Sequence, residues 1–244
     1  MTDPSSQPLR SFTIIFDLDG TLVHTAPDLV RALNHALIGA GLRGVPDMAV
    51  SDLVGSGARA MIEAGLAHQG ADVTKQDIDA MFDVFLDYYV QNIAIESRPY
   101  KGCEDVLTQL AEAGATLCVC TNKKQVLAEE LLRVLGLTDR FASIVGADSV
   151  PNRKPDPGHI IEAVSRAGGH LQNAIMIGDS VTDERAAHGA GLPFILCRFG
   201  YGPILAEPPA YRTTIDDFGG LTTTLVISTI EAYAATASRD FSSV

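Results

Sequence analysis

Short apolar runs recur along the chain and alternate with longer segments in which apolar residues are spaced three or four positions apart. The short runs are rich in β-branched or aromatic residues and occupy residues 12–16, 116–120, 143–145, 174–178 and 194–197. The helically spaced segments occupy residues 102–114, 125–136, 159–168 and 184–191. Strands that alternate with amphipathic helices predict an α/β fold with a doubly wound parallel sheet. A run at 211–215 predicts an edge strand, and residues 221–236 a C-terminal helix.

One connection is far longer than the loops usual in α/β units. Residues 24–98 separate the first predicted strand from the helix that begins near residue 102, and they carry helical spacing at 28–41, 58–70 and 75–93. This pattern predicts an all-helical domain, residues 24–98, inserted into an α/β domain made of residues 1–23 and 99–244. Two hinge segments join the domains. Residues 1–10 are expected to be a disordered lead.

The overall charge excludes some classes of partner. The formal net charge is −12 and the pI about 4.8, which argues against nucleic acid or an anionic membrane surface as a partner. No apolar run approaches the ~20 residues of a membrane span, and the first residues lack the apolar stretch of a signal peptide. We expect a cytoplasmic protein whose four cysteines are reduced. Cys118 and Cys120 alternate in a predicted strand without further Cys or His nearby, so they are expected to be buried as small apolar residues.

The residues that directly follow the predicted strands are polar and chemically suited to one another. Asp17 and Asp19 end the first strand, and side chains two apart on a strand share a face. At ~4 Å and an effective dielectric constant of ~20, two carboxylates repel by roughly 4 kcal/mol, so a cation is expected beside them. The later strands are followed by Thr121, Asn122 and Lys123, then by Lys154, then by Asp179, Ser180 and Asp183. Because the carboxyl ends of parallel strands lie at one edge of a sheet, these residues are predicted to form one site.

Each of these residues also has an ordinary structural interpretation. Asp19 is a common turn residue after a strand, Thr121 and Ser180 are common helix N-caps, and an isolated Lys154 is usually solvated. Their joint placement at one sheet edge favours a functional site. The other candidates are interpreted structurally: we expect Lys123 and Lys124 to be a solvated pair. The three histidines expected on surfaces or helix faces are His35, His68 and His159.

Four segments resemble, in order and spacing, the motifs of the haloacid dehalogenase-like hydrolases. They are FDLDGTLV at 16–23, TN at 121–122, RKPDP at 153–157 and GDSVTD at 178–183. The resemblance covers residues 12–200, and the helical insertion lies where this family carries a cap domain. GADSVPNRKPDPGHI and LVGSGARAM are similar to the phosphoglycolate phosphatase branch of the family. His24 stands where the family usually has Asp, which leaves the hydrogen bonding at the hinge open.

The resemblance implies a Mg²⁺-dependent phosphatase that works through an aspartyl phosphate. The metal ligands it implies are the Asp17 carboxylate, the Asp19 main-chain carbonyl and the Asp179 carboxylate. Asp183 is expected to hold a metal-bound water or to orient Lys154. Oxygen ligands of this kind suit a hard cation such as Mg²⁺.

The same resemblance implies a role for each remaining motif residue. Asp17 is the expected nucleophile, and Asp19 the general acid that protonates the leaving alkoxide and later activates water. Thr121 and Asn122 are expected to hold phosphoryl oxygens, and Lys154 to offset the charge of the transition state. The expected substrate is a small phosphate ester, 2-phosphoglycolate, which is cleaved to glycolate and phosphate. The protein is expected to act as a monomer or homodimer without nucleic acid or membrane partners.

A segment of the predicted cap domain is expected to bind the carboxylate of the substrate. Gly55, Ser56 and Gly57 precede a helix that is expected to begin near Ala58, and main-chain N–H groups at a helix N-terminus can bind a small anion. Arg59 lies close enough in sequence to assist. A plain helix–helix turn is the alternative interpretation of this segment.

Other functions remain open. A sugar-phosphate phosphatase of the same family is one, and a β-phosphoglucomutase-like phosphomutase another, although the basic SREDSL-like cap loop of that mutase is absent from the sequence. A dehalogenase is disfavoured because that branch lacks the second aspartate, which is present here as Asp19. A non-catalytic binding protein on this scaffold is the alternative outside enzymes, yet it should have lost Asp17, Asp19, Lys154 or Asp179.

Overall fold

The structure is a computed structural model that describes residues 7–46, 54, 57–204 and 212–240. Six parallel strands form its central sheet in the order β5-β4-β1-β6-β7-β8. Their bounds are β1 Thr13–Phe16, β4 Thr116–Cys120, β5 Ser143–Val145, β6 Ala174–Gly178, β7 Phe194–Cys197 and β8 Thr213–Ile215. The doubly wound parallel sheet predicted from the sequence is confirmed.

Strand β1 lies at the point where the order of the strands reverses. Its neighbours β4 and β6 run parallel to it, and Phe16 at its end lies opposite Val119 and Ile177. The chain therefore winds outward from β1 in both directions, and loops on opposite sides separate after this strand. In open parallel sheets ligands bind in the crevice formed there.

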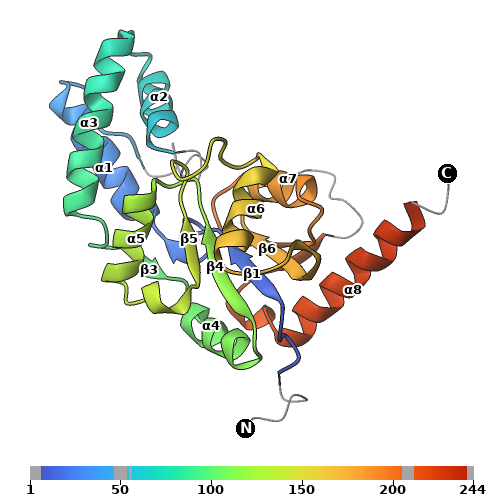
Figure 1. Ribbon diagram of the computed structural model, residues 1–244. Coiled ribbons are helices and arrows are strands. Elements are labelled where there is room, and N and C mark those ends of the chain that lie inside the picture. The colour runs from blue at the N-terminus through green and yellow to red at the C-terminus, as the bar shows by residue number, and fades with distance from the viewer. Residues whose placement is uncertain (1–6, 47–53, 55–56, 205–211, 241–244) are drawn as a thin grey trace.

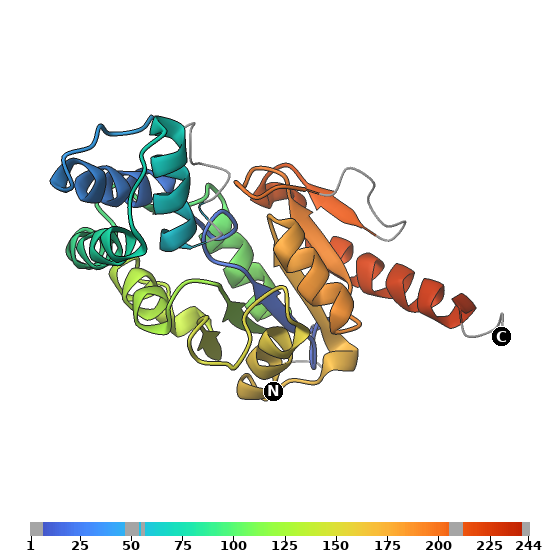
Figure 2. The same ribbon diagram turned by 90° about the horizontal axis from the view of Figure 1, so that it is seen from above.

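Helices cover both faces of the sheet (Figures 1 and 2). The helices of the α/β part are α4 Cys103–Glu112, α5 Gln125–Val134, α6 Pro157–Arg166, α7 Val181–Gly189 and α8 Thr223–Asp240. Short 3₁₀ turns lie at Thr138–Arg140, Leu171–Asn173 and Phe218–Gly220. Ile14 and Phe16 belong to the apolar cluster that includes α4 and α5, whereas Ile15 belongs to the cluster that includes α6 and α7. This alternation along one buried strand follows from the two-residue period of β structure.

Helices α6 and α7 begin earlier than the apolar spacing predicts, because a polar residue caps each of them at its start. Helix α6 begins at Pro157 after Asp156, whose side chain accepts a hydrogen bond from the Gly158 amide. Helix α7 follows Ser180, which forms a reciprocal capping box with Asp183. Cap residues fix the start of a helix more sharply than its apolar face does.

The four cysteines are free and buried. Cys118 and Cys120 lie in the apolar cluster on the α6 and α7 face, as their alternation in the sequence predicts. They act as small core residues. None of the helices in the described part of the chain combines the length and the hydropathy that a membrane-spanning helix requires.

The long insertion is helical, as predicted. It contains α1 Ala26–Gly39, α2 Ala58–Gln69 and α3 Lys75–Gln91, which pack against one another beyond the carboxyl end of the sheet (Figure 1). Their buried face is continuous with the apolar cluster on the α4 and α5 side of the sheet. The division at residues 23/24 and 98/99 stays a prediction.

The two predicted hinge segments pair with each other. They form a short antiparallel ribbon of β2 (Val23–His24) and β3 (Arg98–Pro99). Asp28 at the start of α1 is buried, and its Oδ2 accepts hydrogen bonds from the Ser97 amide and hydroxyl, both at 2.7 Å. These hydrogen bonds connect α1 to the segment directly before β3, through which the chain leaves the inserted helices.

Candidate active site

The predicted polar residues meet at one edge of the sheet, where β1, β4 and β6 end. Asp17 continues the β1 ladder, since its amide donates to the Ile177 carbonyl at 2.9 Å. The Thr121 amide likewise donates to the Val145 carbonyl at 3.0 Å, which extends β4 toward β5. Asp179 directly follows β6. Side chains far apart in the sequence are thus delivered to the same place by backbone hydrogen bonds of neighbouring strands.

Gly20 allows the chain to turn close to Asp179. Its φ is 85°, a conformation that L side chains rarely adopt, and a Cβ there would lie 2.4 Å from Asp179 Oδ2. Thr21 follows, and its hydroxyl donates to Asp179 Oδ1 at 3.1 Å. Gly20 and Thr21, which follow β1, therefore hold the carboxylate of Asp179, which follows β6, in position.

Three buried carboxylates form a cluster with all-oxygen donors. One oxygen each from Asp17, Asp179 and Asp183 lies within 4.8 Å of the other two. Burial raises the pKa of Asp17 to about 8 against the attraction of Lys154, and the charges of Asp183 and Asp179 add to the rise. Burial and the charge of Asp183 raise the pKa of Asp179 to about 6, although main-chain amides oppose the shift. Three carboxylates forced together away from water fit a hard divalent cation, which would relieve their repulsion.

Lys154 lies between two of these carboxylates. Its Nζ is 3.0 Å from Asp17 Oδ1 and 2.6 Å from Asp183 Oδ1, and its side chain is 1% exposed. Although burial opposes the shift, the charges of Asp17 and Asp183 raise the pKa of Lys154. Lys154 is therefore a buried cation that touches the candidate nucleophile, and the solvated-loop interpretation is wrong.

His159 holds the main chain of Lys154 in place. The Lys154 amide donates to His159 Nδ1 at 3.1 Å, and His159 Nε2 donates to the Val145 carbonyl at 3.1 Å. Of the two predicted placements, surface or helix face, the helix face is correct for His159 and the surface is wrong: it lies on the buried face of α6, and its ring is fully buried. Burial and the nearby charge of Lys154 lower the pKa of His159 to about 4, so the imidazole is neutral near pH 7.

The expectation of a solvated lysine pair is wrong for Lys123 and holds for Lys124. Lys123 is buried, and its Nζ donates to both carboxylate oxygens of Asp19 at 2.9 and 3.1 Å. The same Nζ lies 4.7 Å from the centre of the Tyr89 ring, a residue of α3. Lys124 is exposed and lies over Phe82. The inserted helices thus cover the cation that pairs with the candidate general acid.

Thr121 and Asn122 directly follow β4, beside the end of β1 that leads into Asp17. The Thr121 side chain is buried, and its hydroxyl accepts a hydrogen bond from the Lys123 amide at 3.1 Å. Asn122 Nδ2 donates to the Lys154 carbonyl at 3.0 Å, and Asn122 Oδ1 is buried without a partner in the described part of the chain. Both residues line the same cavity as Asp17.

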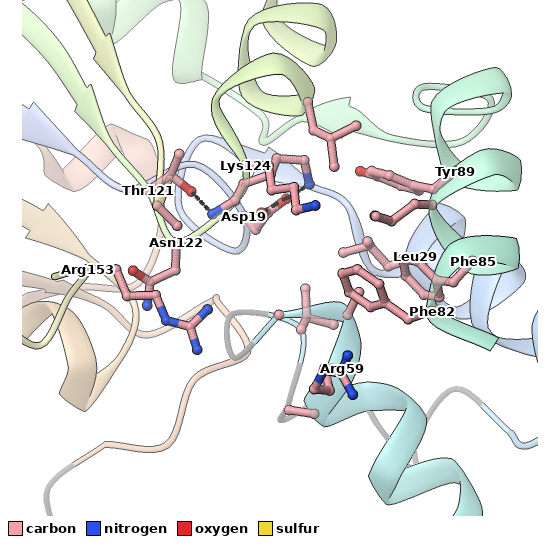
Figure 3. Close-up of a pocket in the computed structure, with 18 of the residues that line it drawn as sticks. Asp19, Leu29, Arg59, Phe82, Phe85, Tyr89, Thr121, Asn122, Lys124 and Arg153 are labelled. Carbon is pink, nitrogen blue, oxygen red and sulfur yellow. Dashed lines mark hydrogen bonds and ion pairs between the residues drawn. The ribbon is translucent and has the colours of Figure 1, made fainter. Parts of the chain in front are cut away.

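That cavity has a volume of about 510 Å³ and lies between the sheet edge and the inserted helices (Figure 3). Asp17, Asp19, Thr121, Asn122 and Lys123 form its polar side. Apolar residues of α1 and α3 form the facing wall: Leu29, Phe82, Phe85, Leu86 and Tyr89. A small phosphate ester fits a cavity of this size with one polar and one apolar side.

The predicted cap segment is described only in part. Gly55 and Ser56 lie outside the described residues, whereas Gly57 precedes α2 and lines the cavity. Arg59 also lines the cavity, but it forms an ion pair with Asp79 and lies 5.2 Å from the centre of the Phe82 ring. The predicted role of this segment in reading the substrate stays a prediction.

Tyr201 connects the acidic cluster to the hinge and was not predicted from the sequence. Its amide donates to Asp179 Oδ2 at 2.8 Å, and its hydroxyl accepts from the Ala26 amide at 3.2 Å and hydrogen-bonds His24 Nδ1. The hinge bonding that the departure at His24 left open is thus supplied by a residue after β7. A Tyr beyond a strand end carries no motif, so no sequence signal marks it.

Known proteins resemble this chain over most of its length. The profile of the haloacid dehalogenase-like hydrolases matches residues 14–197. A phosphoglycolate phosphatase of Agrobacterium fabrum is 43% identical over 233 residues, which cover 96% of this chain and all of that protein. An N-acetylmuramic acid 6-phosphate phosphatase of Pseudomonas aeruginosa is 35% identical over 79% of this chain and 84% of its own length.

A solved structure has the same fold. The crystal structure of a predicted phosphoglycolate phosphatase from Haemophilus somnus superposes with a TM-score of 0.80 at 29% identity, and the match covers 90% of this chain and 98% of that one. The family profile, the related sequences and the solved structure all indicate the family whose four motifs lie at the sheet edge. The chain therefore belongs to the haloacid dehalogenase-like hydrolases, and within them it is a phosphatase.

Proposed function

We propose that this phosphatase hydrolyses 2-phosphoglycolate to glycolate and phosphate, with Asp17 as the nucleophile and Mg²⁺ as the cofactor. The observation that carries the proposal is the buried contact of Asp17 with Lys154 inside the acidic cluster, at the polar side of a small cavity. The similarity to a phosphoglycolate phosphatase over the full length of that protein supports the choice of substrate.

The chemistry starts with attack of an Asp17 carboxylate oxygen on phosphorus. The bond from phosphorus to the ester oxygen breaks, its electron pair stays on that oxygen, and the Asp19 carboxyl supplies the proton. A water molecule then gives its proton back to Asp19 and attacks phosphorus, which releases phosphate and restores the Asp17 carboxylate. Both Asp19 oxygens accept from Lys123 in the structure, so proton donation requires the Asp19 side chain to turn from Lys123 toward the leaving oxygen.

Cations and hydrogen-bond donors held in place by the fold stabilise the negative charge of the phosphoryl group during this reaction. We assign Thr121, Asn122 and Lys154 to the phosphoryl oxygens. Thr121 and Asn122 follow the end of β4, which neighbours β1, and Lys154 comes from the loop after β5 and lies 3.0 Å from Asp17. Asp17, Asp179 and the main-chain carbonyl of Asp19 would hold Mg²⁺, with Asp183 orienting Lys154 at 2.6 Å. When bound, the ion neutralises charge on the phosphate and the carboxylates.

Removal of divalent metal should abolish activity and lower stability together. Chelation leaves the buried carboxylates uncompensated, so we expect kcat to fall by at least about 100-fold and Tm to drop, and Mg²⁺ to restore both. Ca²⁺ should stabilise the fold without restoring turnover, because its larger and looser coordination sphere misplaces the nucleophile. Activity assays and thermal melts on the same samples check this, with Asp179→Asn as a variant whose Tm should no longer respond to Mg²⁺. Full activity after exhaustive chelation would contradict the metal assignment.

The choice of substrate is tested by comparing kcat/KM across three phosphate esters. We expect 2-phosphoglycolate to exceed 2-hydroxyethyl phosphate, which has the same length without the carboxylate, and also to exceed N-acetylmuramic acid 6-phosphate. A higher value for the sugar phosphate would move the assignment to that class, which the Pseudomonas aeruginosa relative represents. Equal values for the two small esters would show that the carboxylate is not recognised.

A further inference from the structure

Arg153 differs from Lys123 and Arg59, two other cations that line the cavity. Lys123 is paired with Asp19 and Arg59 with Asp79, whereas the exposed Arg153 side chain has no hydrogen bond or ion pair within the described residues. Figure 3 shows its guanidinium beside Asn122, extending into the space between the sheet edge and α2. Arg153 directly precedes Lys154, so the loop that supplies the buried cation to Asp17 also carries an unpaired one.

The surroundings of Arg153 are open toward the start of α2. Gly57 has a φ of 97°, and a Cβ at this position would lie 3.5 Å from Arg153 Nη1. The N-cap residue Gly57 has no side chain, so it cannot supply the first main-chain N–H groups of α2 with the partner that a polar N-cap residue would. The guanidinium from the α/β side and the N-terminus of a 12-residue helix from the inserted side thus approach the same space.

We propose that Arg153 binds the carboxylate of the substrate while the phosphoryl group lies at Asp17. This inference rests on the proposed function, because it supplies the recognition of the carboxylate that distinguishes 2-phosphoglycolate from other small esters. A guanidinium presents paired N–H donors in a plane that matches the two oxygens of a carboxylate. The helix N-terminus at Gly57 adds a favourable field for the same anion.

The other free cation in the cavity fits this role less well. Lys124 is a single-point donor, and its Nζ lies 5.2 Å from the centre of the Phe82 ring, on the apolar wall formed by α3. Two carboxylates, Glu63 and Asp148, also line the cavity and would repel a substrate anion placed beside them, so they do not distinguish between the two cations. Arg153 combines a free guanidinium, a neighbouring helix N-terminus and attachment to the loop of Lys154.

The test compares two substrates on matched variants. We expect Arg153→Leu to lower kcat/KM for 2-phosphoglycolate about 10- to 100-fold more than for 2-hydroxyethyl phosphate, mainly through KM. Arg153→Lys should give an intermediate loss, because it keeps the charge and removes the paired donors. The control is Arg133→Leu, since Arg133 is an exposed arginine of α5 that pairs with Glu130 and does not line the cavity. Thermal melts establish that each variant is folded, and Arg153→Gln replaces the Leu variant if that one is not.

Each outcome decides the assignment. A selective loss on the carboxylated substrate in Arg153→Leu and its absence in Arg133→Leu support it. Equal losses on both substrates would mean that Arg153 acts on the phosphoryl site through Lys154, and they overturn it. A selective loss in Lys124→Met but not in Arg153→Leu overturns it in favour of Lys124. If the wild-type protein itself does not prefer the carboxylated ester, the proposed substrate fails first, and this inference fails with it.

Discussion

Asp17→Asn is expected to lower kcat by at least about 10⁴-fold while the protein remains folded. The amide has the shape of the carboxyl group, but it cannot attack phosphorus as an anion or serve as a full metal ligand. Steady-state assays with 2-phosphoglycolate and with p-nitrophenyl phosphate measure the loss, which should be large on both. Asp216→Asn is the matched control, because Asp216 is an exposed aspartate that pairs with Arg198 on the surface.

The stability of the Asp17→Asn variant has a predicted sign. Burial and neighbouring charge raise the pKa of Asp17 to about 8 in the folded protein, above the value near 3.9 of an unfolded chain. The ionised carboxylate therefore costs stability as the pH rises from 4 toward 8 in the absence of metal. Lys154 keeps Asp183 as a partner in the variant. We expect a Tm at pH 8 without metal that equals or exceeds that of the wild type, and a markedly lower Tm or a kcat near the wild-type value would contradict the role of Asp17.

Asp19→Asn is expected to separate substrates by their leaving groups. Glycolate leaves as a strongly basic alkoxide that needs a proton, whereas p-nitrophenolate leaves without one. The first step should therefore fail by about 10²- to 10⁴-fold for 2-phosphoglycolate and change much less for p-nitrophenyl phosphate. The second step, attack by water, loses its base in both cases. Rapid mixing resolves the two steps.

The outcome that contradicts the acid role of Asp19 is a first step slowed equally for both substrates. Lys123→Met provides a further comparison, since it removes the cation bound to Asp19 and leaves the carboxyl group in place. If Asp19 is the acid, the Lys123 variant should still expel the basic glycolate leaving group in the first step, which Asp19→Asn does only slowly.

The sequence predicts those site residues whose positions follow from their spacing and from the strands that they directly follow. Asp17 and Asp19 stand two apart after an apolar strand, and their neighbours follow other strands, so a parallel sheet must bring them to one edge. The structure places Asp17, Asp179 and Asp183 in one buried cluster with Lys154. Strand and helix types follow from periods of two and 3.6 residues, which explains why the strands and helices agree with their predicted ranges while helix starts follow the caps.

Residues that depend on packing between distant segments were missed. The sequence predicts a solvated Lys123 because it stands in the polar stretch 121–125, yet its contacts Asp19 and Tyr89 come from distant segments of the chain. The burial of His159 results from its hydrogen bonds to Lys154 and Val145, which form only once the sheet edge exists. Tyr201 and Arg153 belong to loops, and the hydrophobic periodicity of a sequence does not predict the path of a loop. Tyr201 contacts the hinge, and Arg153 is the residue that we propose binds the carboxylate of the substrate.

The central claim is a covalent phosphoryl bond to Asp17, and trapping that bond tests it most directly. Asp19→Asn protein is mixed with p-nitrophenyl phosphate and Mg²⁺, quenched in acid within the first turnover, and digested for mass spectrometry. Loss of the base for the second step should let the intermediate accumulate, with a burst of p-nitrophenol near one per protein molecule. The account predicts the mass of one phosphoryl group on the peptide that contains Asp17, located at that residue. A peptide that stays unmodified while p-nitrophenol is released, or a phosphoryl group on another residue, would contradict it.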